Sequence, residues 1–246
     1  MKIKKILISQ PQPTNGSPYT ELSTKFNIQV DFFPFFKVEP ISAKEFRLQK
    51  INILDHTAIV FSSRTTIDAF FNLCEELRIA IPETMKYFCV SEAIAHYLQK
   101  YIVFRKRKIF FGNGTITSLT EVIGAKHKNE NFLLTVADNC KSDLNKLFTK
   151  CKYKHSSAIL VSTVFSNLTS VGLEKYDMVV FYSPSDIRSL IENFPDFQQN
   201  GIEFATFGPA TLKALKAHKL NANIIAPTPE APSISKAILD YLEKSK

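Results

Sequence analysis

A strand–turn–helix segment occurs twice in this chain, and the repetition constrains the fold more than any other feature. Residues 175–191, KYDMVVFYSPSDIRSLI, place an apolar run, Met178–Phe181, before a polar turn and a helix start. Residues 58–71, AIVFSSRTTIDAFF, align without gaps on residues 178–191. An unbroken apolar run suits a strand that is covered on both faces, as in a parallel sheet. The repetition favours two related α/β units, with chance similarity between unrelated segments as the alternative.

Alternating strand and helix patterns extend this reading to the whole chain. Between residues 37 and 165 they predict a complete doubly wound domain, with strands at 58–61, 87–90, 108–111, 131–135 and near 157–161, and helices at 65–77, 92–100, 117–123 and 142–149. Residues 1–36 and 166–246 then assemble into a second domain, with strands at 5–9, 28–33, 178–181, 203–207 and 223–226, and helices at 19–26, 184–193, 209–218 and 234–244.

The predicted fold class is therefore α/β: two doubly wound parallel-sheet domains, one inserted into the other and joined by a two-stranded linker. Domain 37–165 is the insertion, and residues 1–36 with 166–246 form the discontinuous domain. Pro34 and Pro40 bracket the segment FPFFKVEP, which we expect to be an extended linker, because the residue before a proline avoids the helical region.

Composition limits the protein class. The chain has 246 residues, of which 45% are apolar and 22% charged, as in ordinary globular proteins. The start, Met1–Lys5, leads straight into a short strand-like run and not into a signal-peptide apolar region, so we expect a cytoplasmic protein. The cysteines, Cys74, Cys89, Cys140 and Cys151, show no CxxC spacing and the histidines are scattered. Neither a metal site nor a disulfide framework is predicted, and no cofactor motif is complete.

The net charge of +8 leaves three kinds of partner open: nucleic acid, an anionic membrane or a small polyanion. The excess is clustered at Lys2–Lys5, Arg105–Lys108 and Lys141–Lys154. A solvated surface explains each cluster equally well. Without a groove or an aromatic platform beside them we expect no nucleic-acid binding and no membrane binding.

Small polar residues recur at the predicted strand ends, and they are the strongest candidates for a site. They are Ser62, Ser63, Ser91, Ser183, Ser185, Gly208 and Thr211. Hydroxyls and backbone N–H groups at such positions bind carboxylates. Each residue alone is more often a helix cap, but the recurrence in both repeats predicts anion binding.

Other motifs are weaker. The turn Gly112-Asn113-Gly114 resembles the start of a dinucleotide fingerprint, but Thr117 occupies the position of the third glycine, so a plain turn is expected. No P-loop occurs, and no G-x-S-x-G surrounds Ser62 or Ser63. His56 is expected to be a loop or surface residue, not a catalytic base.

Three segments carry a family resemblance: YDMVVFYSPSDIRSLIENFPDF, FATFGPATLKALKAHKL and APTPEAPSISKAILDYL. Together they resemble uroporphyrinogen-III synthase, most closely its Bacteroidetes-type form, and the resemblance covers nearly the whole chain. It implies a cofactor-free, monomeric hydro-lyase of haem biosynthesis acting on hydroxymethylbilane, a linear tetrapyrrole with acetate and propionate groups. Loss of the terminal hydroxyl gives an azafulvene, and closure through a spiro intermediate inverts ring D.

The resemblance also implies site residues. By position, the substrate-binding candidates are Ser62 and Ser63 in one domain, Ser183, Pro209 and Thr211 in the other, and in addition Ser91 and Thr228.

One departure matters. Where the family usually carries a tyrosine in a V-Y-R-T-like segment, proposed to help the hydroxyl leave, this chain has Val161. A catalytic residue is therefore not assigned. Tyr182 and Tyr153 are possible substitutes, and Arg64 stands where a small or apolar residue is common. The alternative function is a catalytically weak or inactive relative that binds a tetrapyrrole or another small anion.

Overall fold

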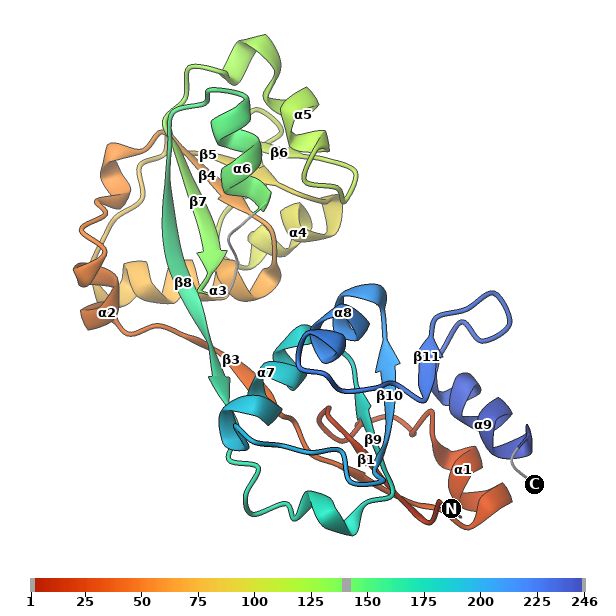
Figure 1. Ribbon diagram of the computed structural model, residues 1–246. Coiled ribbons are helices and arrows are strands. Elements are labelled where there is room, and N and C mark those ends of the chain that lie inside the picture. Colours follow the sequence, from red (N-terminus) through yellow and green to blue (C-terminus); the bar gives the residue numbers. More distant parts are fainter. Residues whose placement is uncertain (1–2, 139–142, 245–246) are drawn as a thin grey trace. The chain divides into compact units, whose positions relative to one another are not determined.

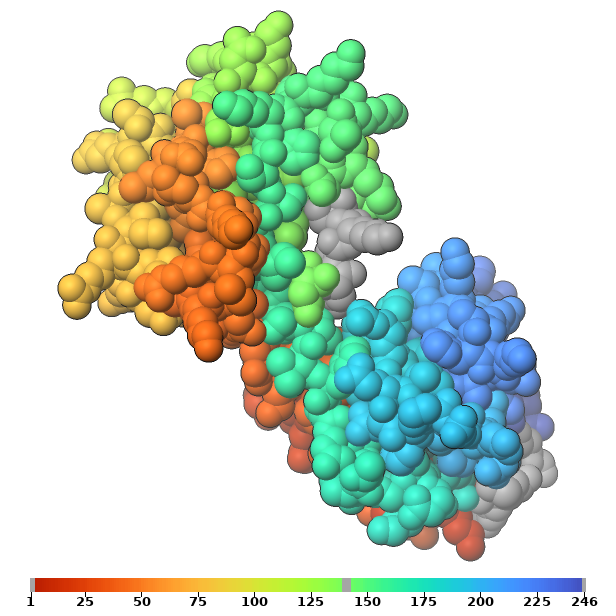
Figure 2. Space-filling view, turned by 60° about the vertical axis from the view of Figure 1, so that its left-hand side comes forward, coloured from red at the N-terminus to blue at the C-terminus, as the bar shows by residue number. Residues whose placement is uncertain are grey.

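The computed structural model describes residues 3–138 and 143–244, which fall into two compact units (Figure 1). The discontinuous unit comprises Met1–Lys37 and Val164–Lys246, and the inserted unit comprises Val38–Thr163. These bounds differ by one or two residues from the predicted 1–36 with 166–246 and 37–165. In the space-filling view, red N-terminal and blue C-terminal atoms lie in one body, because the discontinuous unit is built from both ends of the chain (Figure 2).

The discontinuous unit contains one parallel sheet in the order β11-β10-β9-β1-β2. Numbered along the unit, this is the 2-1-3-4-5 order of a doubly wound sheet. Its strands are β1 (Lys5–Ile8), β2 (Gln29–Phe32), β9 (Met178–Phe181), β10 (Glu203–Phe207) and β11 (Ile224–Ala226). The sequence patterns predicted each of them, because short apolar runs bounded by polar turns are typical of strands buried on both faces.

Helices cover both faces of this sheet. Helices α1 (Thr20–Phe26) and α9 (Ile234–Lys244) pack on one face, against Ile6, Met178 and Val180. Helices α7 (Pro184–Asn193) and α8 (Pro209–Ala217) pack on the other, against Val179 and Phe181. Successive residues of β9 thus alternate between two apolar cores, as the pleat of a strand requires. A short 3₁₀ helix, Leu173–Lys175, precedes β9.

The inserted unit has a six-stranded sheet in the order β3-β8-β7-β4-β5-β6, in which β4 to β8 run parallel. Its strands are β3 (Phe36–Pro40), β4 (Ala58–Phe61), β5 (Lys86–Cys89), β6 (Ile109–Phe111), β7 (Phe132–Ala137) and β8 (His155–Phe165). Its helices are α2 (Ala43–Leu48), α3 (Arg64–Glu76), α4 (Glu92–Tyr97), α5 (Ser118–His127) and α6 (Asp143–Lys150), with 3₁₀ turns at Ile53–Asp55 and Leu98–Lys100. Helices α2, α3 and α4 share one core, and α5 and α6 the other. The predicted α/β class with two doubly wound sheets is confirmed.

Three expectations need correction or completion. The segment FPFFKVEP is not only a linker, since Phe36–Pro40 forms the edge strand β3, where the missing N–H of Pro40 is tolerated. Helix α2 was missed, although Ser42 and Glu45 form a capping box, with Glu45 N–H donating to the Ser42 hydroxyl at 3.2 Å. The helix predicted for 142–149 is α6, and its predicted first residue lies outside the described residues.

His56 is a loop residue, as one of the two expected positions had it, but it is buried and not on the surface. Only 7% of its surface is exposed, and its Nδ1 atom lies 3.0 Å from the backbone oxygen of Asn52. It directly follows the 3₁₀ turn Ile53–Asp55 and precedes β4. It therefore packs in the loop at the amino end of β4.

The sequence repeat is also a structural repeat. Strands β4 and β9 are both completely buried and both lead into a helix through a serine. The backbone angles of Ser63 are φ −151° and ψ 159°, and those of Ser183 are φ −144° and ψ 158°. The same local sequence therefore produces the same strand–turn–helix geometry in both units.

Asp177 ties together the two chain segments of the discontinuous unit. Its Oδ2 atom accepts hydrogen bonds from the backbone N–H groups of Lys4 at 2.8 Å and Lys5 at 2.9 Å. Its own N–H donates to the carbonyl oxygen of Lys5 at 2.9 Å. These bonds hold the start of β1 beside the start of β9.

We predict that Asp177→Ala lowers the free energy of unfolding by about 1–3 kcal/mol, because two backbone donors lose a charged acceptor. Asp240→Ala serves as the control in the same unit. Its carboxylate pairs with Lys236 across one turn of α9 at 2.7 Å, an exposed contact worth about 0.5 kcal/mol or less. Urea denaturation of both variants measures the difference, and equal losses would contradict the tie between segments.

Candidate functional site

Each sheet contains a topological switch point, where adjacent strands lead into helices on opposite faces. In the discontinuous unit β1 leads to α1 and its neighbour β9 leads to α7. In the inserted unit β4 leads to α3 and its neighbour β7 leads to α6. Ligands of open α/β sheets bind outside the carboxyl ends of the strands at such points. The residues that follow β1, β4 and β9 are therefore candidates for ligand contact.

Ser62 and Ser63 follow β4 and differ in what their hydroxyls do. The Ser63 hydroxyl accepts the backbone N–H of Thr66 at 3.2 Å and caps α3. The Ser62 side chain is half-buried and, within residues 3–138 and 143–244, its hydroxyl forms no hydrogen bond. Ser63 thus has a structural role as a cap, whereas Ser62 retains its donor for a ligand.

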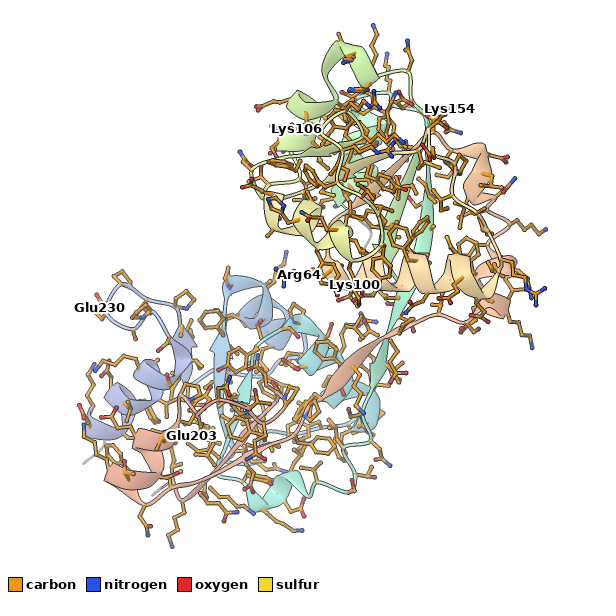
Figure 3. All side chains as sticks on the ribbon, turned by 180° about the vertical axis from the view of Figure 1, so that it is seen from behind. Arg64, Lys100, Lys106, Lys154, Glu203 and Glu230 are labelled. Carbon is orange, nitrogen blue, oxygen red and sulfur yellow. The ribbon has the colours of Figure 1, made fainter. Side chains whose placement is uncertain are left out.

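Two cationic side chains, Arg64 and Lys100, lie near the first turns of α3 (Figure 3). Arg64, the first residue of α3, lies with its guanidinium 5.4 Å from the ring centre of Tyr97. The Lys100 ammonium lies 5.6 Å from the same ring and 2.9 Å from Asp68 Oδ1. Burial opposes ionisation of Asp68, but hydrogen bonds from Tyr101, Lys100 and Tyr97 hold its pKa below the usual range. Asp68 therefore neutralises Lys100, and Arg64 adds a positive charge at this edge of the sheet.

Ser91 lies in a pocket of a different character. It begins α4 without using its side chain as a cap, and its backbone bridges to Asn113. The pocket of about 570 Å³ is also lined by Glu92 and Glu121. Two carboxylates there repel an anion, so Ser91 is better placed to meet a hydrogen-bonding or cationic group than a carboxylate.

The turn Gly112-Asn113-Gly114 has no free donors for a phosphate. The N–H of Gly112 donates to Cys89, that of Asn113 to the Ser118 hydroxyl at 3.0 Å, and that of Gly114 to Val90. A Cβ atom on Gly112 would lie 2.0 Å from the Ser118 oxygen. The glycine serves close packing, as the expectation of a plain turn requires.

Ser183 follows β9 and is bound to Asp186 in the first turn of α7. The Asp186 Oδ2 atom accepts the backbone N–H groups of Tyr182 at 2.9 Å and Ser183 at 2.8 Å, and the Ser183 hydroxyl at 3.3 Å. Asp186 is only 1% exposed, and burial raises its pKa although these donors oppose the shift. Its Oδ1 atom and the Ser9 hydroxyl after β1 are buried without a partner among the described residues.

The start of α8 carries two further candidates. Gly208 precedes it with φ +85°, a conformation that favours glycine. Pro209 has no N–H and cannot donate a hydrogen bond to a ligand. Its fixed φ angle suits the first helical position, where no N–H is needed. The Thr211 side chain is 2% exposed, and its hydroxyl has no hydrogen-bond partner in the described part of the chain. Ser185, in the first turn of α7, is half-buried.

Thr228 follows β11 and is engaged in its own turn. Its hydroxyl accepts the N–H of Ala231 at 3.0 Å, and its N–H donates to the carbonyl oxygen of Ala231 at 3.0 Å. The hydroxyl hydrogen is still available for an acceptor, but the oxygen already stabilises the turn.

The three positions considered for an acid differ in their surroundings. Val161 is 2% exposed in β8 and packs into an apolar core. Tyr153 precedes β8 and packs on Phe132 and Phe148, with ring centres 5.8 and 5.5 Å away, at the amino end of the strands. Tyr182 follows β9 at the carboxyl end, and its hydroxyl is hydrogen-bonded to that of Tyr19, a residue that the sequence did not single out.

Metal and thiol chemistry find no support in the described residues. Residues 3–138 and 143–244 contain no group of three His, Cys, Asp or Glu side chains placed to hold a metal ion. Cys74 and Cys89 are buried free thiols, and burial raises the pKa of each to about 12. Cys151 is a free thiol, and Cys140 lies outside the described residues. None of the helices in the described ranges is long and apolar enough to cross a membrane.

Known proteins resemble this chain in sequence and in fold. The family model for uroporphyrinogen-III synthase HemD matches residues 17–236. The uroporphyrinogen-III synthetase of Helicobacter pylori has 15% identity and a TM-score of 0.59 over 98% of this chain and 100% of that chain. A mutant uroporphyrinogen III synthase of the extremely thermophilic bacterium Thermus thermophilus has 13% identity and a TM-score of 0.58 over 98% and 99%. No curated protein sequence matches.

The solved structures are distant in sequence, so they establish the fold alone. The family model establishes membership, because it spans most of both units and includes the segments around Ser62, Ser183 and Thr211. The chain belongs to the uroporphyrinogen-III synthase family, the lyases of haem biosynthesis that convert hydroxymethylbilane to uroporphyrinogen III.

Proposed function

We propose that the polar residues at the carboxyl ends of β4, β9 and β10 bind the acetate and propionate carboxylates of hydroxymethylbilane while the chain directs closure to the type III isomer. The observation that carries this proposal is the matched geometry of Ser63 and Ser183, each between a central buried strand and a helix N-terminus. Two turns of the same shape place helix N-termini, which attract anions, at the carboxyl ends of central strands. Of the remaining proposed substrate-binding residues, Ser62, Thr211 and Thr228 offer hydroxyls to carboxylates, and Pro209 shapes the first turn of α8. Ser91, which lies beside Glu92 and Glu121, accepts a pyrrole N–H of the substrate.

Orientation is the main task of such an enzyme. Hydroxymethylbilane closes without inversion by itself, so the protein must bring the substituted carbon of ring D to the azafulvene carbon before spontaneous closure occurs. Holding reacting atoms in a near-attack geometry lowers the activation free energy by several kcal/mol. Neutral donors suit this task, since they fix carboxylates in direction without trapping the product by strong ion pairs. Arg64, the residue after Ser63, supplies an additional positive charge for a substrate carboxylate.

We infer that the protein works as a cytoplasmic monomer. The substrate is a polyanion that does not cross membranes unaided, and each unit completes its own sheet from a single chain. We propose no nucleic-acid partner. Size-exclusion chromatography tests whether the protein is a monomer. If nucleic acid competed with tetrapyrrole binding, and this competition depended steeply on salt concentration, the absence of a nucleic-acid partner would be contradicted.

The proposed reaction is tested by an isomer-resolved assay. Hydroxymethylbilane is generated in situ with the protein present, the products are oxidised, and type I and type III uroporphyrins are separated. We expect mainly type III, with heat-denatured protein as the control that yields type I. Only type I from a folded sample would contradict the proposal and identify an inactive relative, whose thermal midpoint would still rise with a bound tetrapyrrole.

Ser62 and Ser63 differ in a measurable way. We predict that Ser63→Ala lowers the free energy of unfolding by about 1 kcal/mol, because α3 loses its cap. Ser62→Ala leaves stability within about 0.5 kcal/mol, because no hydrogen bond within the described chain is lost. Its effect is instead a higher KM, measured with the type III assay. A Ser62→Ala variant with an unchanged KM would exclude that hydroxyl from substrate binding.

Thr211 provides a second test of donor function. We predict that Thr211→Val lowers kcat/KM about tenfold, equivalent to ~1.4 kcal/mol, while the free energy of unfolding changes less. The control is Thr206→Val, since the Thr206 hydroxyl is fully buried in β10 and cannot reach a ligand. Equal losses of stability and turnover in Thr211→Val would count against a substrate contact there.

A further inference from the structure

A pair of tyrosine hydroxyls lies at the switch point of the discontinuous unit. Tyr182 directly follows β9, and Tyr19 directly precedes α1, the helix that follows β1. Their hydroxyl groups are hydrogen-bonded to each other although the residues are 163 positions apart in the sequence. The β1–β9 pairing brings them together, so the pair stands where a ligand of this sheet is expected.

Tyr182 is held in place at three points. Its backbone N–H donates to Asp186 Oδ2 at 2.9 Å, its ring packs on Phe207 with centres 5.8 Å apart, and its hydroxyl bonds to Tyr19. Tyr19 is in turn fixed, because its ring meets that of Phe32 edge-on at 6.0 Å. A hydroxyl with so few alternative positions is preorganised for one direction of hydrogen bonding.

The two phenols differ in exposure, and this decides which one can act on a ligand. Tyr19 is 2% exposed, whereas Tyr182 is half-buried and retains a solvent-facing part. Two hydroxyls share a single hydrogen in their common bond. If Tyr19 donates that hydrogen, the hydrogen of Tyr182 is free to point outward.

The titration behaviour agrees with this direction. Burial raises the pKa of both tyrosines, and the bond between them raises that of Tyr19 further but lowers that of Tyr182. Tyr182 is therefore the more acidic partner, and both phenols are protonated at neutral pH. A neutral phenol that already accepts a hydrogen bond is in the correct state to give up its own proton.

We propose that Tyr182 is the proton donor to the departing hydroxyl of hydroxymethylbilane and that Tyr19 is its positioning residue. This inference rests on the proposed function. The C–O bond breaks with both electrons going to oxygen, which takes the Tyr182 proton and leaves as water. The pyrrole nitrogen lone pair stabilises the resulting carbon centre as an azafulvenium cation that keeps its N–H, and the Tyr182 phenolate is stabilised by the Tyr19 hydroxyl. The proton that ring D releases in the final closure returns to Tyr182, so the enzyme is regenerated.

Other tyrosines are less suited to this role. Tyr97 and Tyr101 donate to Asp68, and Tyr176 donates to Asp31 at 2.9 Å. Tyr153 lies at the amino end of its strand, packed on two phenylalanines. Tyr182 combines a position at the carboxyl end of a strand with a hydroxyl partner, Tyr19, that can stabilise its anion.

The test compares Tyr182→Phe with Tyr176→Phe, a control in the same unit that also loses one phenol hydrogen bond but at the amino end of β9. We expect Tyr182→Phe to lower kcat for type III formation about a hundredfold with KM within twofold of wild type, as removal of a general acid does. Tyr19→Phe should lower kcat about tenfold, and Tyr176→Phe should leave kcat unchanged. Thermal midpoints establish that all three variants are folded.

A second substrate separates proton donation from packing. In a bilane that carries acetate in place of the terminal hydroxyl, the leaving group departs as the stable acetate anion. Its departure needs no proton donor. With it, the ratio of wild-type to Tyr182→Phe kcat should return close to one, and a purely structural defect would persist.

Two outcomes overturn the inference. If wild type forms type III and Tyr182→Phe matches Tyr176→Phe, or if the acetate-bearing bilane does not restore the variant, Tyr182 is not the donor. If wild type forms only type I, the proposed function itself fails and the assignment fails with it.

Discussion

The parallel pairing of β1 with β9 is the interaction on which the discontinuous unit depends. It joins segments from opposite ends of the chain, with Ile6 beside Met178 and Ile8 beside Val180. The same pairing creates the switch point, because β1 and β9 send their helices to opposite faces. The contact that completes the fold is thus also the contact that assembles the Tyr19–Tyr182 pair.

The two repeats show how one local geometry supports two kinds of chemistry. Ser63 and Ser183 share backbone angles, but Ser63 caps its helix through its own hydroxyl, whereas the turn at Ser183 is organised by the buried carboxylate of Asp186. The Asp186 carboxylate accepts the N–H groups of Tyr182 and Ser183, which are the backbone donors between β9 and α7. In the inserted unit the corresponding edge is marked by Arg64 and its stacking on Tyr97.

The fold was largely predictable from the sequence, and the candidate site only in part. Buried strands such as Met178–Phe181 can be predicted because an unbroken apolar run is stable only when it is removed from water. Edge strand β3 was not predicted, since a mostly exposed strand lacks such an apolar run and this one ends in Pro40. Strand-end serines were identified, but whether a hydroxyl caps a helix, as Ser63 does, or lies beside two glutamates, as Ser91 does, depends on neighbours far along the chain.

The sequence by itself determined the α/β class, the repeated strand–turn–helix geometry and the family, because these depend on residues close together along the chain. Tertiary structure alone decided which side chains meet. Tyr19 and Tyr182 share a hydrogen bond, and the carboxylate of Asp177 binds the backbone of Lys4, only because strand pairing brings distant segments within reach. Local sequence patterns indicate the secondary-structure propensity of a segment and which of its side chains are buried. Contacts between segments more than a hundred residues apart are set by sheet order, which no local pattern specifies.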